Sequence, residues 1–194
     1  AGNGFELFPS WSYDGKRIVY VTWTDDGLGT IRVISAGGGG GKAITKTPGH
    51  YRRPRFSPDG RTIVFEKGKG GYLTDSDWSE ASGVYQVSSN GGAITKITEN
   101  GAYPHYAAEN NRVFLSRFED VKASLVSVDL NGGKERLHAS GNMITEFQVA
   151  PTGKHLAFVE NYNAFVMPMT PGAQDVGTGR SATGLPITKA SAIG

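Results

Sequence analysis

The chain has 194 residues, with 20 Lys and Arg against 18 Asp and Glu, and it contains no cysteine. The lack of cysteine excludes disulfide bonds and thiolate metal sites. No apolar run approaches the ~18 residues that a membrane span needs. The longest run of basic residues is Arg52-Arg53, so the sequence does not indicate a nucleic-acid surface. Glycine is abundant, at 28 residues, a level that favours many tight turns between short strands.

Along the chain, the first repeated phrase is "PSWSYDGKRIVYV", which begins at Pro9. Asp14-Gly15 is a turn signal, and the strand-like runs "RIVYVT" and "TIRVIS" follow it. A glycine-rich turn from Gly37 to Gly41 then leads to the short segment "KAITK". This order predicts four short strands joined by hairpin turns.

The same order returns three times. The turn dipeptides are spaced by 45, 50 and 43 residues: Asp14-Gly15, Asp59-Gly60, Glu109-Asn110 and Thr152-Gly153. The strand-like runs after the later three are "TIVFEK" with "GVYQVS", "RVFLSR" with "SLVSVD", and "HLAFVE" with "NAFVMP". The second and third copies continue through Asn-Gly-Gly turns to "AITKI" and "KERLH", whereas the fourth has a longer polar segment before "LPITK".

Four strands in each repeat of about 45 residues are typical of a β-propeller blade. We therefore predict an all-β chain, a β-propeller of about four four-stranded antiparallel blades. It would form one domain, 1–194, with blades at about 1–47, 48–99, 100–140 and 141–194.

The repeated phrase is interpreted as a structural corner rather than a catalytic motif. Glycine tolerates the positive φ of the turn, and Ser12 and Ser57 are suited to hydrogen-bond the turn backbone. The large residue before the corner is expected to wedge between neighbouring blades, at positions Trp11, Phe56, Tyr106 and Val149.

These residues resemble the WD40-like repeat of the TolB family, whose unit reads P-x-W-S-P-D-G-K-x-I-A-F followed by an I-Y-V strand, a G-G turn and L-T. "PRFSPDGRTIVFE", "GVYQVSSNGG" and "AITKIT" match it well, and "PSWSYDGKRIVYV" matches with Tyr13 in place of proline. The resemblance implies a protein-docking propeller that is periplasmic or secreted, although the chain shows no signal peptide. The tail from Val166 onward looks most like that of propellers that precede amidohydrolase domains.

TolB-like rings usually hold six or more blades, so the resemblance implies that the four blades are part of a larger ring. The outer faces of the first and last blades would then lack a neighbour. Exposing several hundred Å² of apolar face costs many kcal/mol at about 25 cal/mol per Å². Such a chain should close into an unusual small ring, pair with a second copy through these faces, or aggregate.

Motifs for catalysis, metals and cofactors are absent from the sequence. "AGGGGGKA" lacks the Gly and the Ser or Thr that frame a phosphate loop. The four histidines show no metal-ligand spacing, and no Gly-x-Ser-x-Gly elbow is present. The carboxylates of "DSDWSE", from Asp75 to Glu80, favour a solvated insertion over a weak calcium loop. We predict no catalytic residue, no metal and no cofactor.

Candidate binding residues lie before each inner strand, where the chain crosses between blades at the mouth of the channel. Aromatic residues and arginine are enriched at binding hot spots. Filling of the channel mouth is the alternative role for the same side chains. The candidates are Glu6, Tyr51, Arg52, Arg53, Tyr103, His105, Thr145 and Glu146.

The sequence favours a non-catalytic module that docks a protein partner or a catalytic domain of the same parent chain. The alternative is a substrate-gating propeller in a larger amidohydrolase or peptidase whose catalytic residues lie outside this chain. An enzyme site within the channel ranks last, because the inner-strand runs "SWS", "RFS", "HYA" and "QVA" offer no carboxylates.

Overall fold

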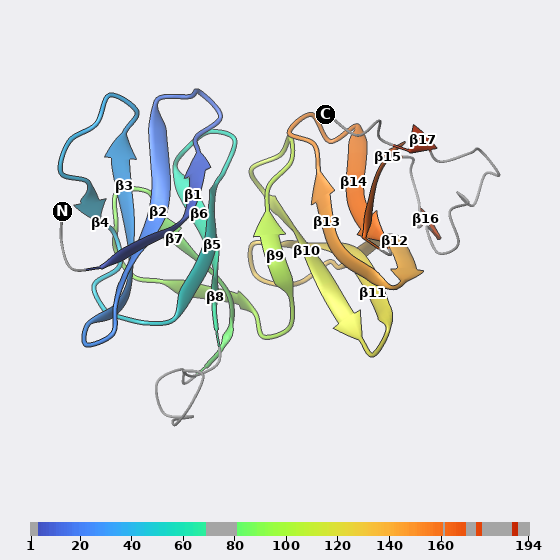
Figure 1. Cartoon of the computed structure of the whole chain (residues 1–194), viewed down its shortest axis with the longest axis horizontal. Helices are drawn as coiled ribbons and strands as arrows, with labels where there is room; N and C mark the ends of the chain where they lie inside the picture. Colours follow the sequence, from blue (N-terminus) through green and yellow to red (C-terminus); the bar gives the residue numbers. More distant parts are fainter. Residues whose placement is uncertain (1–3, 69–80, 161, 170–173, 176–187, 190–194) are drawn as a thin grey trace. The chain divides into compact units, whose positions relative to one another are not determined.

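The computed structural model describes residues 4–68, 81–160, 162–169, 174–175 and 188–189. They form two compact units that divide after Asn100. All the regular secondary structure of these residues is β-strand, arranged in four sheets that follow one another along the chain (Figure 1). The prediction of an all-β propeller of four antiparallel blades is confirmed. The predicted insertion at Asp75 to Glu80 lies outside the described residues.

The first unit contains two four-stranded antiparallel sheets in which each strand pairs with the next. The first blade consists of β1 (Phe5–Trp11), β2 (Arg17–Thr24), β3 (Leu28–Ser35) and β4 (Lys42–Ala43). The second blade consists of β5 (Tyr51–Phe56), β6 (Thr62–Lys67), β7 (Gly83–Ser88) and β8 (Thr95–Thr98).

The second unit contains the other two blades. The third consists of β9 (Ala102–His105), β10 (Arg112–Glu119), β11 (Lys122–Asp129) and β12 (Arg136–Asn142). The fourth consists of β13 (Ile144–Val149), β14 (His155–Glu160), β15 (Asn163–Pro168) and β17 (Thr188–Lys189). One departure from four strands is β16 (Gln174–Asp175), which adds to the third sheet in parallel with β12. This strand comes from the longer polar segment of the fourth copy, for which the sequence predicted no strand of the third sheet.

The core of each unit lies between its two sheets. In the first unit, Val19, Val21 and Ile31 of the first blade belong to one buried cluster with Phe56 and Phe65 of the second. In the second unit, a cluster of the same kind joins the third blade to the fourth; it includes Ala123, Leu125, Ala139, Phe147, Leu156 and Phe158. Each large side chain buried in this way contributes about 1.5–3 kcal/mol, so each blade depends on its neighbour for stability.

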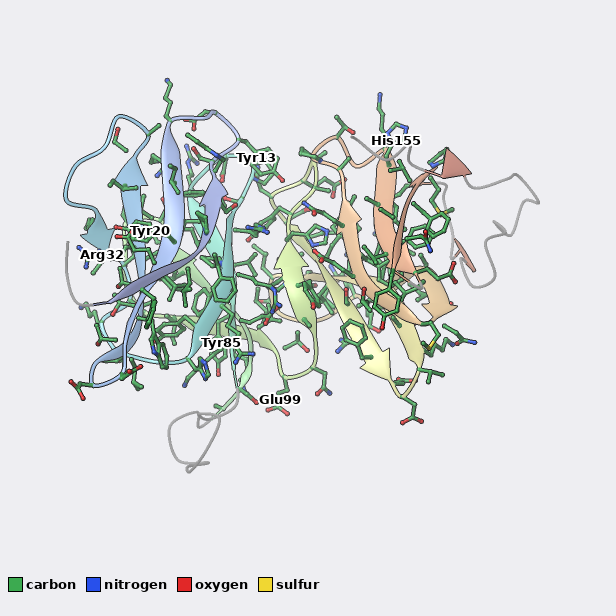
Figure 2. The ribbon with its side chains drawn as sticks, in the orientation of Figure 1. Tyr13, Tyr20, Arg32, Tyr85, Glu99 and His155 are labelled. Atoms are coloured by element: carbon green, nitrogen blue, oxygen red, sulfur yellow. The ribbon has the colours of Figure 1, made fainter. Side chains whose placement is uncertain are left out.

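Trp11 departs from the predicted wedge position. Phe56, Tyr106 and Val149 are buried, but Trp11 is 59% exposed. Strand side chains alternate between faces, and Trp11 pairs with Ile18, which stands beside the core residue Val19. Trp11 therefore lies on the face of the first sheet that points away from the second blade. Tyr20 and its cross-strand partner Arg32 stand on this same face (Figure 2).

The repeated corner has the predicted role. The Ser12 hydroxyl donates to Asp14 Oδ1 at 2.6 Å and accepts from the Arg17 N–H at 3.0 Å. The second corner repeats these bonds, with Ser57 donating to Asp59 at 2.6 Å and accepting from the Thr62 N–H at 3.0 Å. In the fourth corner the Gly153 N–H donates to the Ala150 carbonyl at 2.8 Å, and the Thr152 hydroxyl accepts from the Lys154 N–H at 3.4 Å.

Candidate docking surfaces

A backbone irregularity recurs in the inner strand of the first three blades. Phe8, Arg53 and Tyr103 have positive φ angles of 55°, 48° and 54°, and each lies within a register shift of its strand pair. Positive φ is uncommon for residues other than glycine, and bulges of this kind redirect side chains near functional sites. Two of the three residues, Arg53 and Tyr103, are candidates from the sequence.

In the first unit, Arg52 and its neighbours form a cluster of cationic and aromatic groups. Arg52 Nη2 lies 3.3 Å from His50 Nε2, and the His50 ring lies 5.0 Å from the Trp23 ring, centroid to centroid. All three side chains are half-buried. The arginine therefore keeps a defined position while part of it stays accessible to a partner.

Arg53 is held by a carboxylate and an aromatic ring. Its Nη1 donates to Glu66 Oε2 at 3.1 Å, and its Cζ lies 5.8 Å from the Phe8 ring centroid. Glu66 is buried, so this ion pair is screened less by solvent than a surface pair would be. Glu6 is exposed at the start of β1.

Tyr51 is part of the core rather than the surface. Its ring packs edge-on against Phe65 with centroids 5.3 Å apart, and its hydroxyl donates to the Thr47 carbonyl at 2.7 Å. Burial, and to a lesser degree the neighbouring Tyr85, raises the pKa of this phenol. Tyr51 thus supports the backbone from which Arg52 and Arg53 project.

His105 is likewise buried. Its Nε2 accepts the Val149 N–H at 2.9 Å, so the ring proton must lie on Nδ1, which donates to the Tyr103 carbonyl at 2.8 Å. These two bonds use both ring nitrogens. His105 therefore joins β9 to β13 and fixes the Tyr103 bulge instead of reaching a ligand.

Tyr103 belongs to an apolar surface of the second unit. Its ring contacts the Phe118 ring with centroids 6.2 Å apart. Phe118, Val121 and Met143 are 46%, 62% and 56% exposed, and the Met143 N–H donates to the Val121 carbonyl at 2.8 Å. We call Tyr103, Phe118, Val121 and Met143 the apolar surface.

Thr145 and Glu146, the last two sequence candidates, are exposed on β13, just after Met143. The candidates predicted from the sequence did not include Phe118, Val121 or Met143. The available signal was Val121 in "FEDVK", because an apolar residue is unusual at a hairpin tip, where polar residues dominate.

Among the described residues, no group of three or more His, Asp or Glu side chains could hold a metal ion. Within the same residues, no helix is long and apolar enough to cross a membrane.

Comparisons with known proteins agree with the geometry. The PD40 family, described as the TolB beta propeller domain, matches residues 2–169. The Tol-Pal system protein TolB of Francisella tularensis subsp. mediasiatica (strain FSC147) is 32% identical over 92 residues, which cover 47% of this chain and 19% of that protein. The chain thus spans about a fifth of this curated relative.

Solved structures show the same fold. The crystal structure of TolB from Acinetobacter baumannii superposes with a TM-score of 0.71 at 20% identity, covering 89% of this chain and 43% of that one. The acylaminoacyl peptidase of Pyrococcus horikoshii superposes with a TM-score of 0.61 at 14% identity, covering 87% and 31%. At these identities the likeness is one of fold alone.

Proposed function

Because this chain belongs to the PD40 family of TolB β-propeller domains, we propose that it is a non-catalytic module that docks a protein partner. The apolar surface is the observation that carries the proposal. Exposed apolar groups gathered in one place on a protein mark interaction sites, and Tyr103, one of those here, lies at a bulge that His105 holds in place.

The relatives are named Tol-Pal system proteins, and we infer that the partner is a component of that system or a domain of the same parent chain. A periplasmic or secreted location fits such a partner. On this proposal, Phe118 and Met143 anchor the partner on the second unit, and Arg52 and Arg53 are candidate contacts of the first unit taken by itself. Glu6, Thr145 and Glu146 are polar groups at the edges of these contacts.

Titration calorimetry of the full chain against purified Tol-Pal components tests this role. Phe118→Ser and Met143→Ser should each weaken binding by at least about tenfold, because central apolar anchors carry most of the energy of an interface. Arg52→Ala should weaken it less.

Leu137→Ser is the matched control, because Leu137 is also about half exposed on the third blade but lies at the other end of β12. If the Phe118 and Met143 variants bind the partner as tightly as the wild-type chain and the Leu137 variant do, docking through the apolar surface is contradicted. Loss of binding in all three would instead indicate general destabilisation, which thermal unfolding of each variant would detect.

The gating alternative predicts a catalytic domain in the parent gene. A downstream His-x-His pair with further metal ligands would support it, because that pair is the metal motif of an amidohydrolase. A gene that ends within two further blades would favour the docking role.

We also propose self-association through the outer face of the first blade. The equivalent face of the second blade, which includes Phe56 and Ile63, is covered by Val19 and Val21 of the first. The occupant that suits the Trp11 face is therefore another sheet with small aliphatic residues. The fourth blade of a second copy carries such a face, with Ala157, Val159, Ala164 and Val166 partly or largely exposed.

A further inference from the structure

Two arginines at the same place in the repeat behave differently. Arg17 and Arg112 are the first residues of β2 and β10, the second strands of the first and third blades. Arg17 reaches the next blade: its Nη2 donates to the Gly60 carbonyl at 2.7 Å, and its Cζ lies 4.9 Å from the Phe56 ring centroid. It fills the space between its own blade and the next corner.

Arg112 turns back onto its own blade. Its Nε donates to Ser127 Oγ at 3.1 Å, and its Nη2 donates to the carbonyls of Ser127 and Lys134, both at 2.7 Å. The corner of the fourth blade therefore receives no bond from this arginine. A Cβ built on Gly60 would collide with Arg17 Nη2, whereas one built on Gly153 would meet nothing nearer than Ala108 Cβ at 3.8 Å.

A cavity of about 470 Å³ occupies this space between the third and fourth blades. Its polar lining includes Arg112, Arg136, His138, Glu109 and Thr152, and Phe114 and Met169 contribute apolar surface. The volume lies within the range of small-molecule sites, about 300–1,000 Å³.

The lining carries an excess of positive charge. Among the described residues, the lining contains the guanidinium groups of Arg112 and Arg136 but only one carboxylate, that of Glu109. Arg112 is only 8% exposed and forms no ion pair with a described carboxylate. Its bonds use Nε and Nη2, which leaves the two N–H groups of Nη1 without a hydrogen-bond acceptor among the described residues.

His138 responds to the same charge. Its Nε2 lies 2.7 Å from Ser127 Oγ, the atom that also accepts from Arg112. Burial, followed by Arg112 and then Arg136, lowers the pKa of His138. Glu109 is the acidic group of the lining, and Thr152 and Gly153 of the fourth-blade corner are uncharged.

We propose that this cavity binds a small organic oxyanion, a carboxylate or a phosphate monoester, whose head contacts Arg112 Nη1 and Arg136 while its apolar body packs on Phe114 and Met169. A buried charge is costly unless it is paired, and arginine suits both kinds of oxyanion. Asp129 and Glu109 act on Arg112 electrostatically without forming an ion pair with it, and the anion supplies the direct contact that these carboxylates do not.

The test is titration of the full chain, followed by NMR at the Gly153 and Ala107 amides. Benzoate, phenyl phosphate and inorganic phosphate serve as the probes, with benzamide as a neutral analogue of benzoate. Benzoate or phenyl phosphate should shift both amides saturably, and benzamide should bind at least about tenfold more weakly, because hydrogen bonds to charged groups are the stronger ones. The anion that binds more tightly, benzoate or phenyl phosphate, identifies the preferred head group. Inorganic phosphate has no apolar group, so its affinity shows whether the apolar body is needed.

Substitutions distinguish binding in this cavity from a general attraction of anions to the positive charges of the chain. Arg136→Gln should weaken benzoate or phenyl phosphate binding about tenfold or more, whereas Arg17→Gln, at the place of Arg112 in the first blade, should leave it unchanged. Ala108→Phe, which narrows the cavity without removing a charge, should also abolish the shifts. Equal binding of benzoate and benzamide, equal effects of the Arg136 and Arg17 variants, or no shift at these amides would each overturn the proposal.

Discussion

His105 accepts a hydrogen bond from the backbone N–H of Val149 at 2.9 Å, although 44 residues separate them in the chain. The bond joins the inner strands of the third and fourth blades. A histidine that the sequence offered as a binding residue is thus a fixed connection between two sheets.

His105→Ala should destabilise the chain by about 2–4 kcal/mol. The change leaves the buried Val149 N–H without its acceptor, at a cost of about 1–3 kcal/mol, and it also removes ring packing against Phe114. Urea unfolding followed by fluorescence measures the loss. His155→Ala is the control, because His155 is exposed (Figure 2), and a similar effect of both substitutions would contradict the role given to His105.

The first unit should lose stability in acid through its two serine–aspartate corners. Hydrogen bonds from Ser12 and Ser57 are the main cause that lowers the pKa of Asp14 and Asp59 below the ordinary value of 3.8. A carboxyl with a lowered folded pKa contributes stability above its unfolded pKa and loses it as the pH falls through the folded value. We expect this contribution to be complete at neutral pH and to disappear below pH 3.8.

Urea midpoints measured from pH 7 down to pH 2 test this dependence. Asp59→Asn should flatten the acid limb, while Asp26→Asn, at an exposed turn between β2 and β3, should leave it in place. Both corner carboxylates are exposed, so the effect should be small and should shrink in high salt.

Gly60→Ala should cost more than Gly153→Ala. The two glycines have positive φ angles of 68° and 71°, so both substitutions carry a similar backbone penalty of about 1–2 kcal/mol. Only the new methyl group at position 60 displaces the Arg17 side chain, with its bond to the Gly60 carbonyl. We expect an additional cost of about 1 kcal/mol, and equal midpoints for the two variants would contradict the contrast between the two arginines.

Trp11→Ser should reduce self-association of the chain. Truncating a tryptophan that serves as an interface hot spot costs at least about 2 kcal/mol of binding energy, which is more than a tenfold shift in a dimer dissociation constant. Sedimentation equilibrium measures it, with Tyr162→Ser as a control at a fully exposed residue of the fourth blade. A wild-type chain that stays at 20.6 kDa at all concentrations would exclude pairing.

The strands were predictable because their signals are local. Runs such as "TIVFEK" are rich in β-branched and aromatic residues, and Asp-Gly at the corner requires a backbone that glycine allows. The corner bonds of Ser12 and Ser57 followed from the same local logic.

The side-chain directions were less predictable. Tyr51 and Arg52 are adjacent, yet the first is core and the second is partly accessible, because strand faces alternate and the bulge at Arg53 changes the register. The cavity beside Arg112 was missed because it depends on which of two blades that side chain contacts. Trp11 and Phe56 hold equivalent places in the repeat, but only Phe56 has a sheet packed over it.

The parallel pairing of β16 with β12 has a dynamic consequence. The chain leaves the fourth sheet after β15, bonds to the edge of the third at Ala139 and Ser140, and returns as β17 to pair with β15. Separating these two sheets therefore requires the β16–β12 pairing to break as well as loss of their shared interior. Amide protons of β11 and β14 should accordingly exchange with deuterium at matching rates, through one concerted opening.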